Sequence, residues 1–355
     1  MFWMSLFELL KRLSEAPGVS GFEYSVSNII RDELKNHVNS IQTDKLGNLI
    51  CVKEGLKEKP TLMIAAHMDE IGLIVKHVDE KGFLRFAKLG GISDHLLLGS
   101  RVAIHTRKGI VYGVIGCKPI HLMREEERKQ LVPYDKMFID IGAKSREEAE
   151  EFGVRVGDPI TLERNLIQLK NNLVCGKAFD DRVGCAILIE VLKNSKPKSR
   201  VYGVFTVQEE VGLRGATVSA FSLNPDVGIA IDVTTSADHP EVSEHESPVK
   251  VGLGPAILVA DGRRDSLAGG LISNINLRNK LIELAERLKI PYQVEVAEGG
   301  TTDATAIHLT QKGIPSCVLS IPTRYVHSFS EVLSLKDAEN LVKLLTAFVE
   351  EEFSP

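Results

Sequence analysis

Two adjacent glutamates follow a stretch of sequence that reads as a buried strand. Residues 201–207 (VYGVFTV) are mostly apolar, and Glu209 and Glu210 come directly after the next residue, with a glycine-containing turn behind them. Like charges repel where a chain leaves a core, so their placement side by side needs a chemical reason. A site that activates water requires a metal ligand and a separate proton carrier, and two consecutive glutamates can supply both.

Four more side chains of metal-binding type lie at comparable places. Three of them end or follow apolar runs that read as strands, and the fourth lies where a loop enters a predicted helix. They are His67 (after 61–66), Asp232 (ending 227–232), His327 (six residues after 316–321) and Asp180. Ligands of open α/β sheets bind outside the carboxyl ends of the strands. We therefore expect these groups to converge at one edge of one sheet.

Each of these residues has an ordinary alternative when it is taken alone. A lone histidine such as His67 after a strand is usually just a polar residue near the surface, and Asp232 could start a turn. The pair Asp180 and Asp181 could cap the N-terminus of a helix, which stays the favoured interpretation of Asp181. The convergence of all the groups shifts the interpretation toward a metal site.

The donor set contains two imidazoles and three carboxylates, without a thiolate. This mixture suits zinc, cobalt or manganese better than calcium or magnesium. Five ligands suit two ions, because a single catalytic zinc takes three protein ligands and a water, and two neighbouring cations need a bridging carboxylate. Asp69 could accept the other ring N–H of His67 and fix its orientation, or it could cap a turn.

The elements that must position these groups form two kinds of pattern. Buried strand runs alternate with helical patterns, which predicts an α/β domain with a helix–sheet–helix layering. Residues 73–162 show short strands and tight turns instead, typical of a small barrel or sandwich. We expect a catalytic domain of residues 1–71 and 164–355, with an inserted β-rich domain of residues 72–163. The charged run 124–129 reads as a solvated loop.

Composition bounds the function. The 355 residues are 43% hydrophobic and 26% charged, with a formal net charge of −5, which gives no basic field for nucleic acid. Five scattered cysteines without a CxxC pair favour reduced thiols and a cytoplasmic location. Charged residues interrupt the apolar N-terminus, so residues 5–16 read as an amphipathic helix rather than a signal, and we expect no membrane span.

Eight motifs, in order along almost the whole chain, resemble the tetrahedral aminopeptidases, a family of self-compartmentalising dinuclear metallopeptidases. The motifs are APGVSGFE (16–23), DKLGNLI (44–50), AAHMDEIG (65–72), KAFDDR (177–182), TVQEEVGLRGA (206–216), AIDVT (230–234), GGTTDATAIH (299–308) and RYVHS (324–328). Together they are far more specific than any single motif.

The resemblance assigns a role to each candidate residue. It implies that Asp180 bridges two divalent ions, zinc or cobalt, and that Glu209 is the general base. It places His67 and Asp232 on the first ion and Glu210 and His327 on the second, with Asp69 orienting His67. It implies a catalytic domain with an inserted PDZ-like barrel that drives dimerisation into a twelve-subunit tetrahedron. The expected substrates are short peptides, and the expected water bridges both ions.

Some positions depart from the family pattern. The loop GGTTDATA carries Thr301 where relatives commonly have a third glycine, which leaves this loop and Asp303 without a clear role. Residues 235–272 match only loosely and are expected to shape the substrate pocket. His239 and His245 in this region read as surface histidines, because the set of five ligands is complete without them.

Two other classes of function compete with a peptidase. Paired carboxylates also serve glycoside hydrolysis, and some relatives carry a cellulase label, but consecutive Glu209 and Glu210 do not naturally face each other across a sugar bond. A metal-storing or assembling protein would keep the ligands without turnover, and it would have no use for Glu209.

Overall fold

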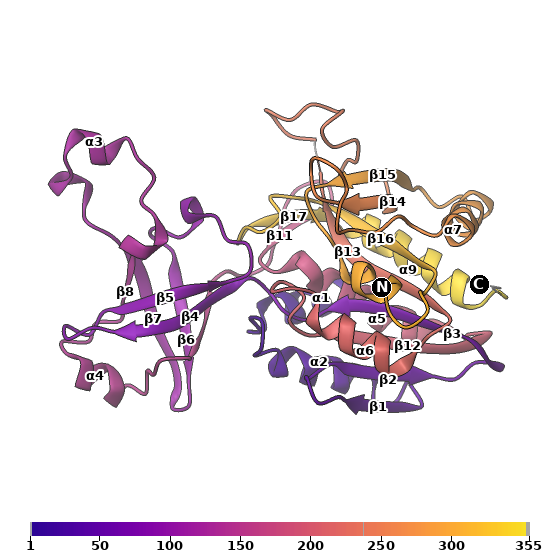
Figure 1. The fold of residues 1–355 in the computed structure, drawn as a ribbon, viewed down its shortest axis with the longest axis horizontal. Coiled ribbons are helices and arrows are strands. Elements are labelled where there is room, and N and C mark those ends of the chain that lie inside the picture. The colour runs from indigo at the N-terminus through magenta and orange to yellow at the C-terminus, as the bar shows by residue number, and fades with distance from the viewer. Residues whose placement is uncertain (1, 237, 353–355) are drawn as a thin grey trace.

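The structure is a computed structural model that describes residues 2–236 and 238–352. Residues 1, 237 and 353–355 of the predicted catalytic domain lie outside the described part. The chain forms a layered α/β domain, and a small barrel projects from one side of it (Figure 1). The predicted fold class is confirmed.

A large mixed sheet forms the centre of the α/β domain. Its order is β1-β2-β12-β3-β13-β16-β17-β11-β10, with β14 paired to β16 and β15 paired to β14. The strands are β1 (Ser40–Thr43), β2 (Leu49–Lys53), β3 (Lys57–His67), β10 (Ile167–Gln168), β11 (Leu173–Gly176), β12 (Ser199–Thr206), β13 (Val227–Thr235), β14 (Ala256–Gly262), β15 (Gln293–Glu298), β16 (Ser316–Arg324) and β17 (Glu331–Ser334). The four predicted apolar runs form the parallel strands β12, β3, β13 and β16 at its middle.

These middle strands are apolar on both faces because helices cover the sheet on both sides. In β3, Leu62, Ile64 and Ala66 pack into the core on one face, while Met63 and Ala65 pack into the core on the other. Successive side chains of a strand point to opposite faces, so a continuous apolar run is what a doubly covered strand needs.

The helices divide between the two faces of the sheet. One layer contains α1 (Phe2–Glu15), α2 (Tyr24–Leu34), α5 (Phe179–Asn194), α7 (Ile275–Arg287) and α9 (Leu335–Val349), and the other contains α6 (Arg214–Leu223) and α8 (Asp303–His308). In α1 the predicted apolar stripe of Leu6, Leu9, Leu10 and Leu13 is buried against the first layer, so the amphipathic helix is confirmed.

The barrel is closed by six strands between residues 72 and 162. Its strands are β4 (Gly72–Val78), β5 (Leu84–Leu89), β6 (Arg101–Thr106), β7 (Gly109–Gly116), β8 (Phe138–Asp140) and β9 (Pro159–Leu162), in the order β4-β5-β8-β7-β6-β9. Short helices accompany them: η1 (Asp94–Leu96), η2 (Ile120–Leu122), α3 (Glu125–Arg128), η3 (Tyr134–Lys136) and α4 (Arg146–Glu151). The barrel has its own buried core, separate from that of the sheet.

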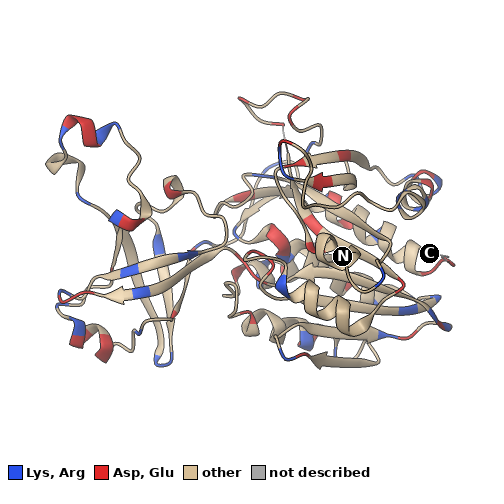
Figure 2. Ribbon diagram, viewed as in Figure 1, with Lys and Arg blue, Asp and Glu red and all other residues tan. Residues whose placement is uncertain are grey.

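The prediction of a loop at residues 124–129 is wrong in part. The segment is exposed as expected, but Glu125–Arg128 forms one helical turn, α3. The carboxylate of Glu127 accepts a hydrogen bond from the backbone N–H of Arg124, and Lys129 pairs with Glu125 one turn away, which stabilises the turn locally. Figure 2 shows acidic and basic residues interspersed over both domains.

Candidate metal centre

The register of the parallel strands brings the predicted ligands to one edge of the sheet. Thr206, the last residue of β12, pairs with His67, the last residue of β3. On the other side of β3, Ala230 pairs with Ala65, so two residues further along Asp232 of β13 lies beside His67. The convergence expected from the sequence therefore follows from strand pairing.

Asp180 lies between the two candidate histidines. Its Oδ1 is 3.0 Å from Nε2 of His67, and its Oδ2 is 3.3 Å from Nε2 of His327. Asp180 belongs to both candidate ligand groups, one with His67 and Asp232 and the other with Glu210 and His327, and within each group the ligand atoms lie within 4.8 Å of one another. One carboxylate thus faces two groups of ligands, as a bridging ligand must.

Hydrogen bonds on the far ring nitrogens leave Nε2 of both histidines facing the centre. Nδ1 of His327 lies 3.0 Å from the carbonyl oxygen of Gly91, in the segment between β5 and β6. Nδ1 of His67 lies 3.1 Å from the carbonyl oxygen of Asp69 and 3.6 Å from its carboxylate Oδ1. A proton on each Nδ1 satisfies these carbonyls and keeps the Nε2 lone pair available for a metal ion.

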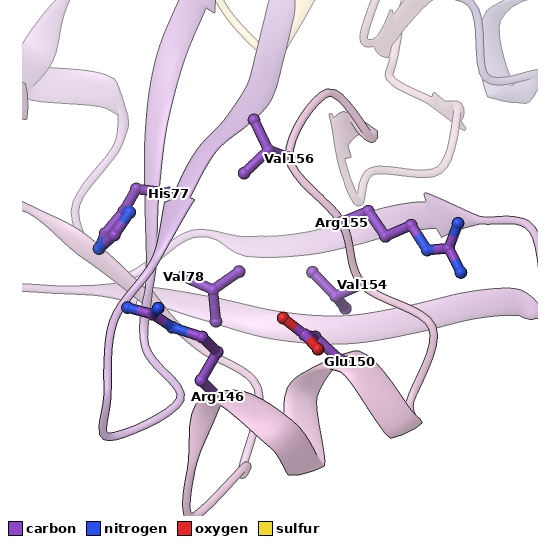
Figure 3. A pocket seen from close by; sticks show the side chains of 7 residues that line it. All are labelled: His77, Val78, Arg146, Glu150, Val154, Arg155 and Val156. Atoms are coloured by element: carbon purple, nitrogen blue, oxygen red, sulfur yellow. The ribbon is translucent and has the colours of Figure 1, made fainter.

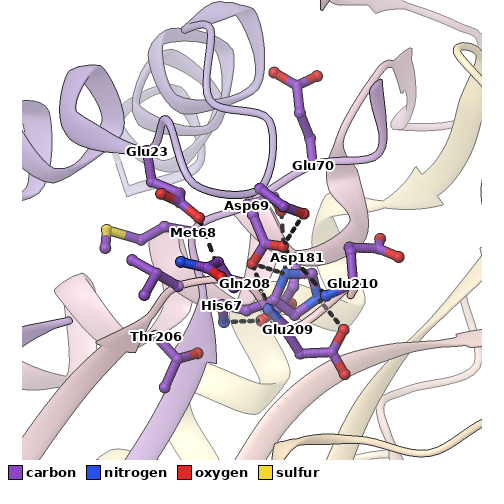
Figure 4. Close-up of polar contacts among 12 residues, drawn as sticks. Glu23, His67, Met68, Asp69, Glu70, Asp181, Thr206, Gln208, Glu209 and Glu210 are labelled. Carbon is purple, nitrogen blue, oxygen red and sulfur yellow. Dashed lines mark hydrogen bonds and ion pairs between the residues drawn. The ribbon is translucent and has the colours of Figure 1, made fainter. Parts of the chain in front are cut away.

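The acceptor on Asp69 differs from the one expected. The main-chain carbonyl is closer to the His67 ring than the carboxylate is, because the carboxylate oxygens accept other hydrogen bonds. The hydroxyl of Ser20 donates to Oδ2 at 2.6 Å. The backbone N–H groups of Glu209 and Glu210 donate to Oδ1 and Oδ2, respectively (Figure 4). Asp69 therefore joins the histidine to the loop that carries both glutamates.

The two glutamates face different parts of the centre. Oε2 of Glu210 is 3.4 Å from Nε2 of His327, which places Glu210 among the ligand groups. Oε2 of Glu209 is 4.0 Å from Nε2 of His67, and Glu209 belongs to neither group. The arrangement matches one ligand and one unligated carboxylate from consecutive residues.

Burial and mutual repulsion perturb the carboxylates. Burial, followed by the charge of Asp180, raises the pKa of Glu210 to about 7. Burial also holds the pKa of Asp232 and of Glu209 well above its usual range. Burial would raise the pKa of Asp180 too, but hydrogen bonds from His327 and His67 lower it overall. Carboxylates gathered away from water favour a proton or a cation.

The residues present fit divalent cations. Among the described residues, the ion pairs of Asp180, Glu209 and Glu210 involve only histidines, and Asp232 has none, so lysine or arginine does not neutralise this cluster. An oxygen- and nitrogen-rich donor set with a shared carboxylate is the chemistry that zinc and cobalt accept.

A buried glutamate that the sequence did not reveal holds two of the ligands. Glu331, at the start of β17, is 1% exposed, and its carboxylate accepts the backbone N–H groups of Phe179, Asp180 and His327. His327 has a φ of +60°, a backbone conformation that non-glycine residues rarely adopt, and this hydrogen bond helps to stabilise it. A glutamate directly before the short apolar pair Val332 and Leu333 was the only signal in the sequence.

Asp181 and Asp303 lie beside the centre without joining a ligand group. Asp181 accepts the backbone N–H groups of Gly184 and His67, so its expected capping role is found and extends to the end of β3. Asp303 is 3% exposed, accepts a hydrogen bond from Thr206 through Oδ2, and has no hydrogen-bond partner for Oδ1 among the described residues.

The remaining candidates lie elsewhere. His245 is exposed and His239 is half-buried beside the ring of Tyr325, and among the described residues neither belongs to a candidate ligand group. A pocket of about 440 Å³ lies beside the barrel, between β4 and α4 (Figure 3). It is lined by His77, Val78, Arg146, Glu150, Val154, Arg155 and Val156, none of which belongs to the ligand groups.

The known proteins that this chain resembles include aminopeptidases, both by sequence and by structure. A sequence model of the M42 glutamyl aminopeptidases matches residues 47–344. The lysyl aminopeptidase of Pyrococcus furiosus is 38% identical over 98% of this chain and 99% of its own. An aminopeptidase of Desulfurococcus kamchatkensis has a similar solved structure, with 42% identity, a TM-score of 0.94, and coverage of 99% of this chain and 96% of that one.

A second solved structure bears on assembly. This structure is the TET1 peptidase of Pyrococcus horikoshii, which is described as able to form a tetrahedron or a large octahedral shell. It is 38% identical to this chain, with a TM-score of 0.88 and coverage of 98% of this chain and 100% of that one.

In the described part of this chain, none of the helices combines the length and apolar character needed to cross a bilayer.

Proposed function

We propose a specific activity for this chain, which belongs to the M42 glutamyl aminopeptidase family and is a peptide-bond hydrolase. In this proposal it removes single residues from the free N-terminus of short peptides. Two divalent ions assist the reaction, and Glu209 is the general base. The observation that carries this proposal is the position of Asp180, whose two oxygens face His67 and His327. A shared carboxylate between two ligand groups is what a pair of ions requires.

Two ions would use all five predicted ligands. His67, Asp232 and one oxygen of Asp180 would hold the first, while Glu210, His327 and the other oxygen would hold the second. Ions bound there would polarise the scissile carbonyl and lower the pKa of a water that bridges them. Zinc and cobalt both suit the donors, so the proposal includes either metal.

Glu209 is proposed to carry the proton. Its carboxylate lies beside the ligand groups and is 9% exposed, so bulk water competes little for it. As a base it removes the proton of the attacking water, and as an acid it then gives that proton to the departing amine. Burial raises its pKa, which makes the carboxylate a stronger base toward the attacking water. Asp69 assists by binding the backbone of the loop that carries Glu209.

Assembly into a dodecamer is proposed from the relatives and from the barrel surface. The similarity to a peptidase described as forming a tetrahedron supports a homo-oligomer. Strand β7 exposes an apolar stripe, Ile110, Tyr112 and Val114, with exposed fractions of 53%, 61% and 41%. Alternate residues of a strand share one face, so the stripe is continuous and is proposed to pack against a second copy of the barrel.

The relatives do not indicate which N-terminal residue of the peptide substrate this chain prefers. The family description names a glutamyl activity and one relative carries a lysyl one, which need pockets of opposite charge.

The five cysteines are free, which suits the proposed cytoplasmic location.

A panel of chromogenic aminoacyl substrates tests the function. We expect turnover with added zinc or cobalt, loss of turnover with EDTA, and recovery when the metal is returned. A simple glycosidase would act on sugar substrates and keep its activity in EDTA, and a metal-storing protein would turn over nothing. Either result would overturn the proposal.

A further inference from the structure

The loop between β12 and α6, residues 207–213, carries Glu209 and Glu210 and is called the catalytic loop below. Three consecutive backbone N–H groups of this loop donate to two buried carboxylates. Gln208 donates to Oε1 of Glu23 at 3.1 Å, Glu209 donates to Oδ1 of Asp69 at 2.9 Å, and Glu210 donates to Oδ2 of Asp69 at 3.2 Å (Figure 4). Gln208, Glu209 and Glu210 are thus each held by a carboxylate.

The loop needs such support because its backbone is unusual. Gln208 has a φ of +56°, in the left-handed region that favours glycine. The residue immediately before Glu209 is therefore held in a conformation that an isolated chain avoids. The hydrogen bond from Gln208 to Glu23 acts at this strained position, whereas Asp69 acts on the two residues after it.

Glu23 is itself fixed by its surroundings. It is 5% exposed, and Oε1 also accepts the backbone N–H of Gly21 at 2.7 Å. The segment before Glu23 is tied to α5, because the fully buried Arg182 of that helix donates to the carbonyl oxygens of Ala16 and Gly18. The N-terminal segment therefore forms a rigid support for one end of the catalytic loop.

We propose that Glu23 is a positioning residue for the proton carrier. By accepting the N–H of Gln208, it sets the turn that directs Glu209 toward the reacting water. This inference rests on the proposed function of Glu209. The competing interpretation is structural only: Glu23 precedes α2 and could merely stabilise the start of that helix.

Three substitutions separate the two interpretations. Glu23→Gln keeps an acceptor oxygen at the same reach, Glu23→Ala removes it, and Glu23→Asp keeps the charge but shortens the side chain by one methylene. Asp226→Ala is the matched control, because Asp226 also accepts a backbone N–H, that of Thr61 at 2.7 Å, in β3 but six residues before His67. All variants are assayed with saturating metal for kcat, KM and Tm.

We expect Glu23→Ala and Glu23→Asp to lower kcat about 10- to 100-fold while KM changes less than about threefold, because a small displacement of a catalytic group is costly. Glu23→Gln should stay within about threefold of the wild-type kcat. Asp226→Ala should lower Tm and leave kcat near wild type. A wild-type kcat in Glu23→Asp, a change confined to KM, or a Gln variant as slow as the Ala variant would each overturn the inference.

Amide hydrogen exchange gives a second readout that does not depend on turnover. We expect faster exchange over residues 205–213 in Glu23→Ala and Glu23→Asp, and wild-type exchange in Glu23→Gln. Unchanged exchange in all three variants would contradict the contact. If the wild-type protein hydrolyses none of the substrates, the proposed function fails, and exchange still decides whether Glu23 holds the loop.

Discussion

Oδ1 of Asp180 lies 3.0 Å from Nε2 of His67, which is the last residue of β3 in the middle of the sheet. The second oxygen of Asp180 faces another histidine, so this aspartate is the common member of two ligand groups. Removal of a shared ligand should affect both ions, whereas removal of an unshared ligand should affect mainly one.

Asp180→Ala should therefore lose both metal ions and all measurable turnover. Asp232→Ala removes a ligand from only one group, and we expect it to retain close to half of the wild-type metal. Metal content per subunit, measured by plasma emission after dialysis, checks both variants. Equal metal loss in the two variants would argue against a bridging role for Asp180.

Glu209→Gln should abolish turnover with the metal content unchanged. The amide has nearly the shape of the carboxylate but cannot take a proton, and general base catalysis contributes about 100- to 10,000-fold to rates. Glu209 also lies outside both ligand groups. Steady-state kinetics beside a metal assay provide the measurement. A variant that keeps most of its kcat would show that another group is the base.

Glu295 should make stability depend on pH. Glu295 on β15 is 5% exposed, and burial raises its pKa to about 7 from 4.5. Between these values the unfolded chain has released the proton that the folded chain keeps, so stability falls as pH rises from 4.5 to 7 and is then flat. At about 1.4 kcal/mol for each pKa unit, the rise from 4.5 to about 7 corresponds to a loss of roughly 3.5 kcal/mol.

Glu295→Gln should remove this loss. Its Tm should fall less than that of the wild type between pH 5 and pH 7.5, as calorimetry can measure. Glu298→Gln, an exposed glutamate on the same strand, is the control and should follow the wild type. Parallel Tm curves for wild type and Glu295→Gln would contradict the prediction.

Tyr112→Asp should weaken assembly. It places a charge in the apolar stripe of β7, where burial against a second copy would desolvate it. Light scattering should give the wild type near twelve times the 39.0 kDa chain mass and the variant a smaller species. Phe221→Ser, at a residue 65% exposed on α6, is the control outside the barrel. A wild type that stays a monomer or dimer would contradict the proposed dodecamer.

The main features of the centre could be predicted from the sequence because strands impose order. Apolar runs marked the parallel strands of the sheet, and the residues that follow them must meet at one edge whatever the loops do. That reasoning, with the family resemblance, led to His67 and Asp232 and to the pair Glu209 and Glu210.

The supporting residues could not be predicted in this way. Glu23 and Glu331 act by accepting backbone N–H groups from loops, and those contacts depend on positive φ values at Gln208 and His327. Spacing along the chain does not encode such loop conformations. The single helical turn at Glu125–Arg128 was missed for a similar reason, since it depends on local hydrogen bonds within a charged segment.

The most direct test is a crystal structure of the zinc- or cobalt-loaded protein with anomalous scattering recorded at the absorption edge of the metal. The account predicts two anomalous peaks at the carboxyl edge of the sheet, one bound by each oxygen of Asp180. A single peak, or two peaks that do not share Asp180, would contradict it.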